Sequence, residues 1–154
     1  MVSGAERIIN LFDVYIGGDN ISIPKVTSGV VVVIWDPIRK ISSACHIFSA
    51  GSGTAPTGFS SHIEIESTID KMIQLLGVDT SAIVRLRAKI AGCSDIPGLK
   101  LGSNLRNTVL GTLKMKNVPI GGFDTGGSVG RNIRFNPKDG KMFVEYFTGG
   151  NKVV

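Results

Sequence analysis

The sequence predicts an α+β fold: a mixed or antiparallel β-core of hairpins with two main helices packed outside it. Apolar residues make up 42% of the 154 residues and charged residues 19%, so the chain can bury a core and is neither disordered nor a coiled coil. Its 20 glycines suit a chain rich in turns. Short β-branched runs dominate, two stretches have helical spacing, and no repeat or linker interrupts them. We therefore expect one domain over residues 1–154.

The N-terminal third predicts strands. Residues 6–16 carry spaced aliphatic side chains and predict the entry of a strand, and residues 17–20 (GGDN) predict a loop. Residues 22–48 predict one β-hairpin, with a β-branched and aromatic run at 30–35, turn-forming residues at 36–40 (DPIRK) and a return strand at 41–48. Because the run at 30–35 is apolar on both faces, we expect a central strand that is covered on each side.

The hairpin brings a glycine and a histidine together. If its turn is centred between Pro37 and Ile38, Gly29 lies directly opposite His46 on one face of the sheet. Gly29 ends a Thr-Ser-Gly turn, and a histidine beside such a turn is a candidate site for chemistry. A histidine at a strand end is also a common structural residue, so this pairing alone does not assign a role.

Two helices are expected after the hairpin. Residues 49–61 are small and polar, as in a lid, a binding loop or a plain connection. Residues 61–64 (SHIE) resemble a capping box, and residues 65–76 then repeat apolar side chains at helical spacing up to Gly77. Residues 84–90 alternate apolar with basic side chains and predict a strand with one solvated face. A second helix is expected over residues 103–116.

The C-terminal part again predicts strands and turns. Residues 118–120 predict an edge strand, and residues 123–127 (FDTGG) predict a tight turn in which Asp124, Gly126 and Gly127 are structural. Residues 132–135 and 141–147 predict a second hairpin across the turn at 136–140 (NPKDG).

Charge and cysteine content exclude several classes of function. The net charge of +5 is modest, and the basic residues are scattered without an RNP or helix-turn-helix pattern, so we expect no nucleic-acid partner. The N-terminus does not resemble a signal peptide, and no window is long enough to span a bilayer, so we expect no membrane insertion and a cytoplasmic location. Two cysteines, Cys45 and Cys93, make neither a disulfide framework nor a zinc site. We expect no metal and no cofactor.

Several short blocks together resemble the CheD family of chemoreceptor glutamine deamidases. They follow the family's order from about Ile8 to Val144, without large insertions. The blocks are Thr27-Ser28-Gly29-Val30, Trp35-Asp36-Pro37, Ala44-Cys45-His46, Ala88-Lys89-Ile90-Ala91-Gly92, Asp124-Thr125-Gly126-Gly127 with Gly130-Arg131, and Asn136-Pro137-Lys138-Asp139-Gly140-Lys141. Each block alone is weak, whereas their common order and spacing are specific.

The resemblance implies a fold, an activity and partners. It implies a single CheD-like domain with a cysteine-hydrolase-type fold, in a cytoplasmic protein of chemotaxis that hydrolyses receptor glutamine side chains to glutamate. The partners it implies are the cytoplasmic helices of chemoreceptors and a CheC-like phosphatase. It also implies that His46 is the catalytic histidine, and that the backbone of Thr27, Ser28 and Gly29 lies at the oxyanion site.

The sequence departs from the family at the nucleophile. Such a deamidase attacks the amide with a cysteine thiolate, which a histidine keeps deprotonated, and the position of that cysteine is held here by Gly29. Cys45 is a possible substitute, although alternation along the strand turns it to the face opposite His46. The same parity disfavours Ser28, unless a β-bulge breaks it.

Two further departures surround this position. The family's supporting threonine falls on Ile23, with Ser22 as the nearest hydroxyl and possible substitute, and an arginine before the second helix falls on Asn104. A single engineered Cys-to-Gly change would leave these neighbours intact. The resemblance therefore implies a deamidase family member with impaired activity. The alternatives are a non-catalytic binding module for receptor helices or a CheC-like phosphatase, and an active deamidase that uses Cys45 or Ser28.

Overall fold

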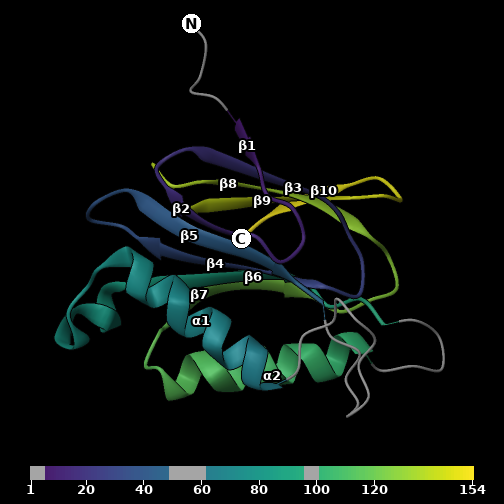
Figure 1. Ribbon diagram of the computed structural model, residues 1–154. Helices are drawn as coiled ribbons and strands as arrows, with labels where there is room; N and C mark the ends of the chain where they lie inside the picture. The colour runs from purple at the N-terminus through teal and green to yellow at the C-terminus, as the bar shows by residue number, and fades with distance from the viewer. Residues whose placement is uncertain (1–5, 49–61, 96–100) are drawn as a thin grey trace, which may run out of the picture.

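The computed structural model describes residues 6–48, 62–95 and 101–154, which form three layers. Within these residues the chain forms two five-stranded sheets and two α-helices. One sheet, here called the central sheet, lies between the other, here called the outer sheet, and the pair of helices (Figure 1).

Both sheets are mixed. The outer sheet has the order β1 (Glu6–Ile8), β3 (Asn20–Val26), β8 (Arg131–Asn136), β9 (Lys141–Tyr146), β10 (Asn151–Val153). The central sheet has the order β2 (Val14–Gly17), β5 (Ile41–Ile47), β4 (Val30–Asp36), β6 (Arg87–Gly92), β7 (Ile120–Thr125). The pairs β1–β3 and β6–β7 are parallel, and the other pairs are antiparallel. The predicted α+β class with a mixed β-core is confirmed.

The two helices cover one face of the central sheet (Figure 1). Helix α1 (His62–Leu76) buries the stripe Ile65, Ile69, Met72 and Leu76. Helix α2 (Leu101–Met115) buries Leu105, Val109 and Leu113. Both stripes repeat every three or four residues, as the sequence predicts for helices with one apolar face. Neither of the helices in the described part of the chain is long and apolar enough to cross a membrane.

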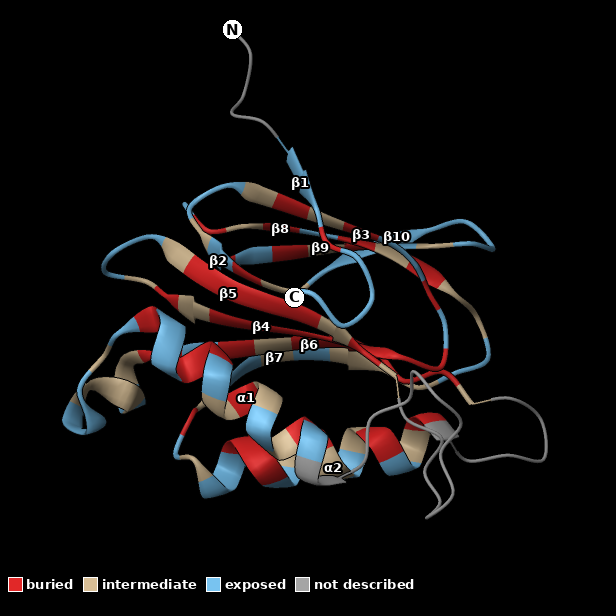
Figure 2. Cartoon of the chain, viewed as in Figure 1, coloured by how far each residue is buried: buried red, intermediate tan, exposed pale blue. Residues whose placement is uncertain are grey.

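Strand β4 is the centre of the structure because both of its faces are buried. Val30, Val32 and Ile34 belong to the core under the helices, whereas Val31 and Val33 belong to the core between the sheets. All five side chains are 0% exposed, and Figure 2 shows β4 and β5 buried along most of their length. The uninterrupted apolar run at 30–35 is thus explained by two cores, as expected of a covered strand.

The predicted hairpin forms, but the prediction of its register is wrong. The turn spans residues 37–40, where Ile38 N–H donates to the Asp36 carboxylate at 3.0 Å and Lys40 N–H to the Asp36 carbonyl at 2.9 Å. This four-residue turn pairs Val31, not Gly29, with His46. Residues 22–26 also lie outside the hairpin, because they belong to β3 in the other sheet.

Other boundaries differ from expectation. The expected strand at residues 84–90 begins with a 3₁₀-helix, Thr80–Arg85, and β6 starts only at Arg87. Ile83 and Leu86 pack on the same core at a spacing of three, which suits a 3₁₀ turn and imitates alternation. Asp124 lies in β7 rather than in a turn, and the expected loop at 17–20 shrinks to residues 18–19. Strand β10 was not expected. The loop at 49–61 and the start of the capping box lie outside the described residues.

Candidate functional site

Gly29 and His46 meet although they are not paired. Val31 pairs with His46, and Gly29 is two residues before Val31, so a glycine at 29 remains on the same face of the strand as the histidine. A Cβ atom built on Gly29 would lie 2.9 Å from Nε2 of His46 and 2.9 Å from the carbonyl oxygen of Ile47. The imidazole therefore occupies the space into which a side chain at position 29 would point.

His46 is half-buried and held by its backbone. Its carbonyl accepts a hydrogen bond from Phe12 N–H at 2.8 Å, and Leu11 forms a parallel bridge with it. Burial, which disfavours the charged imidazolium, lowers the pKa of His46 to about 4. At neutral pH the ring is uncharged and only weakly basic.

Neither cysteine can serve as a ready nucleophile. Cys45 and Cys93 are each 1% exposed, and both belong to the core under the helices. Burial raises the pKa of each thiol to about 12, so both stay protonated at neutral pH. Cys45 pairs with Val32, whose side chain faces the helices. Cys45 therefore points away from His46, as alternation along the strand predicts.

The expected turn at Thr27-Ser28-Gly29 is a bend packed on the end of β6. Cys93 N–H donates to the Gly29 carbonyl at 2.8 Å, and Ser94 N–H donates to the Thr27 carbonyl at 3.1 Å. Gly92 has φ +116°, and a Cβ on it would collide with the Gly29 carbonyl oxygen. The bend needs a residue without a side chain at 92 to come this close.

The two serines predicted near the site lie in different environments. Ser28 is buried at 6% exposure, within the bend itself. Ser22 lines a hollow of about 520 Å³ on the far face of the outer sheet, together with Phe143 and Phe147. Since Gly29 and His46 lie on the side of the central sheet that faces inward, Ser22 is not brought to them.

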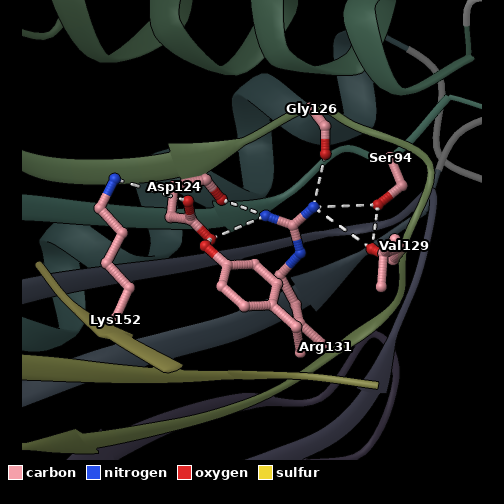
Figure 3. Close-up of polar contacts among 7 residues, drawn as sticks. Ser94, Asp124, Gly126, Val129, Arg131 and Lys152 are labelled. Atoms are coloured by element: carbon pink, nitrogen blue, oxygen red, sulfur yellow. Dashed lines mark hydrogen bonds and ion pairs between the residues drawn. The ribbon is translucent and has the colours of Figure 1, made fainter. Parts of the chain in front are cut away.

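A buried polar cluster lies behind the bend, and the sequence did not predict it (Figure 3). Arg131 is 2% exposed. Its guanidinium forms an ion pair with Asp124 at 2.9 Å and donates to Ser94 Oγ at 3.1 Å and to the Gly126 carbonyl at 2.5 Å. Tyr146 O–H donates to Asp124 at 2.8 Å. The cluster ties β7, β8, β9 and the end of β6 together, and Gly126 and Gly127 turn the chain around it at φ +94° and +75°.

The sequence pointed to only one part of this cluster. Gly130-Arg131 formed part of a block that resembled a family, whereas its partners Ser94 and Tyr146 come from separate segments. Lys152 Nζ lies 3.8 Å from the second Asp124 oxygen. No group of three or more metal-binding side chains occurs within residues 6–48, 62–95 and 101–154.

Asp124 is not a partner of His46. His46 pairs with Val31, Val31 with Ala91, and Ala91 with Asp124, so the four lie in one row across the central sheet. Adjacent strands are about 4.8 Å apart, which separates the two ends of the row by roughly 14 Å. Asp124 therefore cannot orient the imidazole, and its carboxylate is engaged by Arg131 and Tyr146 instead.

Among solved structures, the crystal structure of the hypothetical protein YfiH of Bacillus licheniformis is similar, with a TM-score of 0.48 and 15% identity. The match covers 75% of this chain and 51% of that protein. Likeness at this level is loose, and the fold described above rests on the strand pairing and the two cores of this chain.

A family model and several sequence relatives match this chain over most of its length or more than half of it. A family model described as "CheD chemotactic sensory transduction" matches residues 56–146. A protein of Desulfitobacterium hafniense named probable chemoreceptor glutamine deamidase CheD is 31% identical over 82% of this chain and 83% of its own length. A Methanosarcina mazei relative, probable chemoreceptor glutamine deamidase CheD 1, is 33% identical over 80% of this chain and 57% of its own length. The chemoreceptor glutamine deamidase CheD of Thermotoga maritima is 26% identical over 82% and 81%. This chain belongs to the CheD family.

Proposed function

We propose that this chain acts in chemotaxis by binding the cytoplasmic helices of chemoreceptors, without hydrolysing their glutamine side chains. One observation carries this proposal: no thiol can reach the position beside His46. Gly29 occupies that position, and both cysteines of the chain are buried, with thiol pKa values of about 12.

The charge state of the thiols supports the loss of hydrolysis. A thiol with a pKa of about 12 has a thiolate fraction on the order of 10⁻⁵ at pH 7. Cys45 also faces the helices, so its sulfur and the His46 ring lie on opposite sides of the central sheet. An amide carbonyl placed against His46 would meet no sulfur.

A serine nucleophile is also disfavoured. Ser28 is 6% exposed, and a serine needs a neighbouring base to remove its proton. With a pKa of about 4, His46 is a poor proton acceptor at neutral pH. The alternative of an active deamidase that uses Ser28 or Cys45 therefore has little chemical support.

Recognition does not need the nucleophile. The relatives from Desulfitobacterium hafniense and Thermotoga maritima are named for action on chemoreceptors, and the shared family supports the same partner for this chain, in the cytoplasm. A CheC-like phosphatase is the second candidate partner, and it would compete with the receptor if both contacted the region of Gly29 and His46.

The test combines binding with ammonia release. The chain is incubated with a recombinant cytoplasmic fragment of a chemoreceptor from the same organism, and the Thermotoga maritima relative serves as the positive control for hydrolysis. We expect measurable binding by isothermal titration calorimetry, and ammonia release no greater than that of the His46→Ala variant. Ammonia release that His46→Ala or Cys45→Ser abolishes would overturn the loss of hydrolysis, and an absence of binding would overturn the proposed partner.

A further inference from the structure

The guanidinium of Arg131 bonds two separate parts of the chain. Its Nη1 donates to the carboxylate of Asp124 at 2.9 Å, and its Nη2 donates to Ser94 Oγ at 3.1 Å, as Figure 3 shows. Ser94 Oγ in turn donates to the Val129 carbonyl at 2.8 Å. Because Ser94 is only 5% exposed, it cannot move without breaking a buried hydrogen bond.

Ser94 also holds the bend at residues 27–29. Its backbone N–H donates to the Thr27 carbonyl at 3.1 Å, and the preceding N–H, of Cys93, donates to the Gly29 carbonyl at 2.8 Å. Two carbonyls of the bend are thus fixed by one dipeptide at the end of β6. A continuous series of hydrogen bonds therefore runs from the guanidinium through this serine to the bend.

Arg131 also adjoins the bend through its own backbone. Arg131 pairs with Val26 in the outer sheet, and Val26 directly precedes the bend. A Cβ atom built on Gly130 would lie 3.0 Å from Cγ2 of Thr27, so the methyl group of Thr27 lies close to the Gly130 backbone. The bend is thus held by the start of β8 as well as by the end of β6.

The direction of one backbone donor depends on this support. A peptide unit is planar, so the Ser28 N–H points opposite to the Thr27 carbonyl of the same unit. Because that carbonyl accepts from Ser94, the Ser28 N–H is turned away from the cluster, and it donates to no other backbone group within the described part of the chain. Next to it, the Cβ position of Gly29 faces Nε2 of His46. A shift of Ser94 would turn this donor and move the glycine at the imidazole.

Arg131 does not act on His46 by its charge. Burial accounts for the low pKa of His46, and no charged residue contributes to it. The positive charge of Arg131 is instead paired with Asp124. The connection between the cluster and the site is therefore made by hydrogen bonds and backbone position.

We propose that Arg131 and Ser94 are positioning residues, which hold the bend at residues 27–29 in the shape that a chemoreceptor fragment binds beside His46. The affinity part of this inference rests on the proposed function, whereas the positioning of the bend does not. If the bend loses order in the free chain, binding has to restore that order, and the cost appears as a higher Kd.

Ser94→Ala and Tyr146→Phe form a matched pair, because each removes one hydroxyl from the same cluster. Tyr146 bonds Asp124, on the side of the guanidinium away from Ser94. In NMR spectra we expect Ser94→Ala to shift the Ser28 amide resonance, to speed up hydrogen exchange of the Cys93 amide, and to raise the measured pKa of the nearby imidazole as water reaches the ring. Tyr146→Phe should leave these signals close to those of the wild type.

Receptor affinity is measured on the same two variants. Ser94→Ala should raise the Kd for the recombinant receptor fragment about three- to tenfold, which is the range expected for one lost hydrogen bond. Tyr146→Phe should leave the Kd within about twofold of the wild type.

Two further variants separate positioning from stability. Arg131→Lys removes the bond to Ser94 and should change the Ser28 and His46 signals in the same direction as Ser94→Ala. Asp36→Asn breaks buried ion pairs at the other end of β4. It should lower the melting temperature without changing these signals.

The outcomes are distinguishable. If the wild-type chain does not bind the fragment, the proposed function and the affinity part fail, and the NMR comparison still decides whether the cluster positions the bend. If Ser94→Ala leaves the Ser28 and His46 signals unchanged, or if Tyr146→Phe or Asp36→Asn changes them as much, the positioning is wrong and the cluster contributes only to stability. If the signals change while the Kd does not, the bend is outside the receptor contact and the affinity part is wrong.

Discussion

The imidazole of His46 stands where a side chain on Gly29 would begin. The distance of 2.9 Å from a Cβ at position 29 to His46 Nε2 is too short for an unstrained contact, but a ring can rotate away. The distance of 2.9 Å to the Ile47 carbonyl oxygen involves backbone, which moves less easily. The atoms around Gly29 therefore leave no space for a larger side chain at this position.

Restoring a cysteine should not restore hydrolysis. We expect Gly29→Cys and Gly29→Ala to lower the free energy of unfolding by similar amounts, about 1–3 kcal/mol, because both add the same Cβ to a closed position. Urea unfolding measures this change. Ammonia release from a receptor fragment by Gly29→Cys should stay at the wild-type background. A Gly29→Cys variant as stable as the wild type and active in hydrolysis would show that the site is intact.

The stability of the chain should depend on the protonation of His46. Its pKa is about 4 in the folded chain, below the ordinary value of 6.5, because burial disfavours the charged ring. The unfolded chain therefore binds a proton first as the pH falls. The contribution of His46 is present above about pH 6.5 and is lost between pH 6.5 and pH 4, by up to about 3 kcal/mol.

His46→Gln isolates this contribution, because glutamine does not titrate. In urea unfolding from pH 7 to pH 4, the wild-type chain should lose more stability than the variant. Parallel curves for the two proteins would mean that the His46 ring is not protected from protonation.

The sequence predicted the faces of strands better than their partners. Gly29 and His46 were expected to be directly opposed, but the turn is longer and His46 pairs with Val31. The two residues nevertheless lie close together, as predicted. Side chains alternate with a period of two along a strand, so an error of two residues in the register keeps them on the same face. Cys45 was placed on the opposite face by the same parity.

The polar cluster around Arg131 could not be predicted in this way. Its partners come from three separate strand ends: Ser94 and Asp124 at strands of the central sheet, and Tyr146 at a strand of the outer sheet. They meet only because the two sheets stack on each other. The positive φ of Phe12 was not predicted either. Phe12 N–H donates to the carbonyl of His46, which is more than thirty positions away in the chain.

The hydrogen bonds of the Arg131 guanidinium should contribute more to stability than its charge alone. Arg131→Lys keeps the charge, but one ammonium nitrogen cannot replace both Nη1, which donates to Asp124, and Nη2, which donates to Ser94 and the Gly126 carbonyl. We expect it to lower the free energy of unfolding by about 2–4 kcal/mol. Tyr146→Phe removes only the 2.8 Å hydrogen bond to Asp124 and should lower it by about 1 kcal/mol. Equal effects of the two changes in urea unfolding would contradict the central position of Arg131 in the cluster.

Asp36 links the hairpin turn to the rest of the chain. Its side chain is 0% exposed and forms ion pairs with Arg39 at 2.7 Å and Arg85 at 2.8 Å. The Arg39 guanidinium also donates to the Leu76 carbonyl at the end of α1. Burial alone would raise the pKa of Asp36, but hydrogen bonds from Arg85 and Arg39 outweigh it and lower the pKa to about 2.

Asp36→Asn should therefore destabilise the chain in a manner that depends on pH. The change leaves both arginines without their carboxylate, but these side chains are 33% and 40% exposed and remain partly solvated. We expect a loss of about 2 kcal/mol at pH 7. Because the folded pKa lies below the unfolded one, the wild-type advantage is constant above about pH 5 and shrinks as the pH falls from 4 towards 2.

The control for this change is Asp139→Asn. Asp139 accepts an exposed hydrogen bond from Lys141 N–H at 3.0 Å in the turn of the second hairpin. An asparagine oxygen can accept the same bond, so we expect less than about 0.5 kcal/mol of change. Urea unfolding at pH 7 and pH 3 compares the variants. If Asp36→Asn were as mild as Asp139→Asn, or if its effect did not shrink at pH 3, the ion pairs of Asp36 would not be the link between the turn and α1.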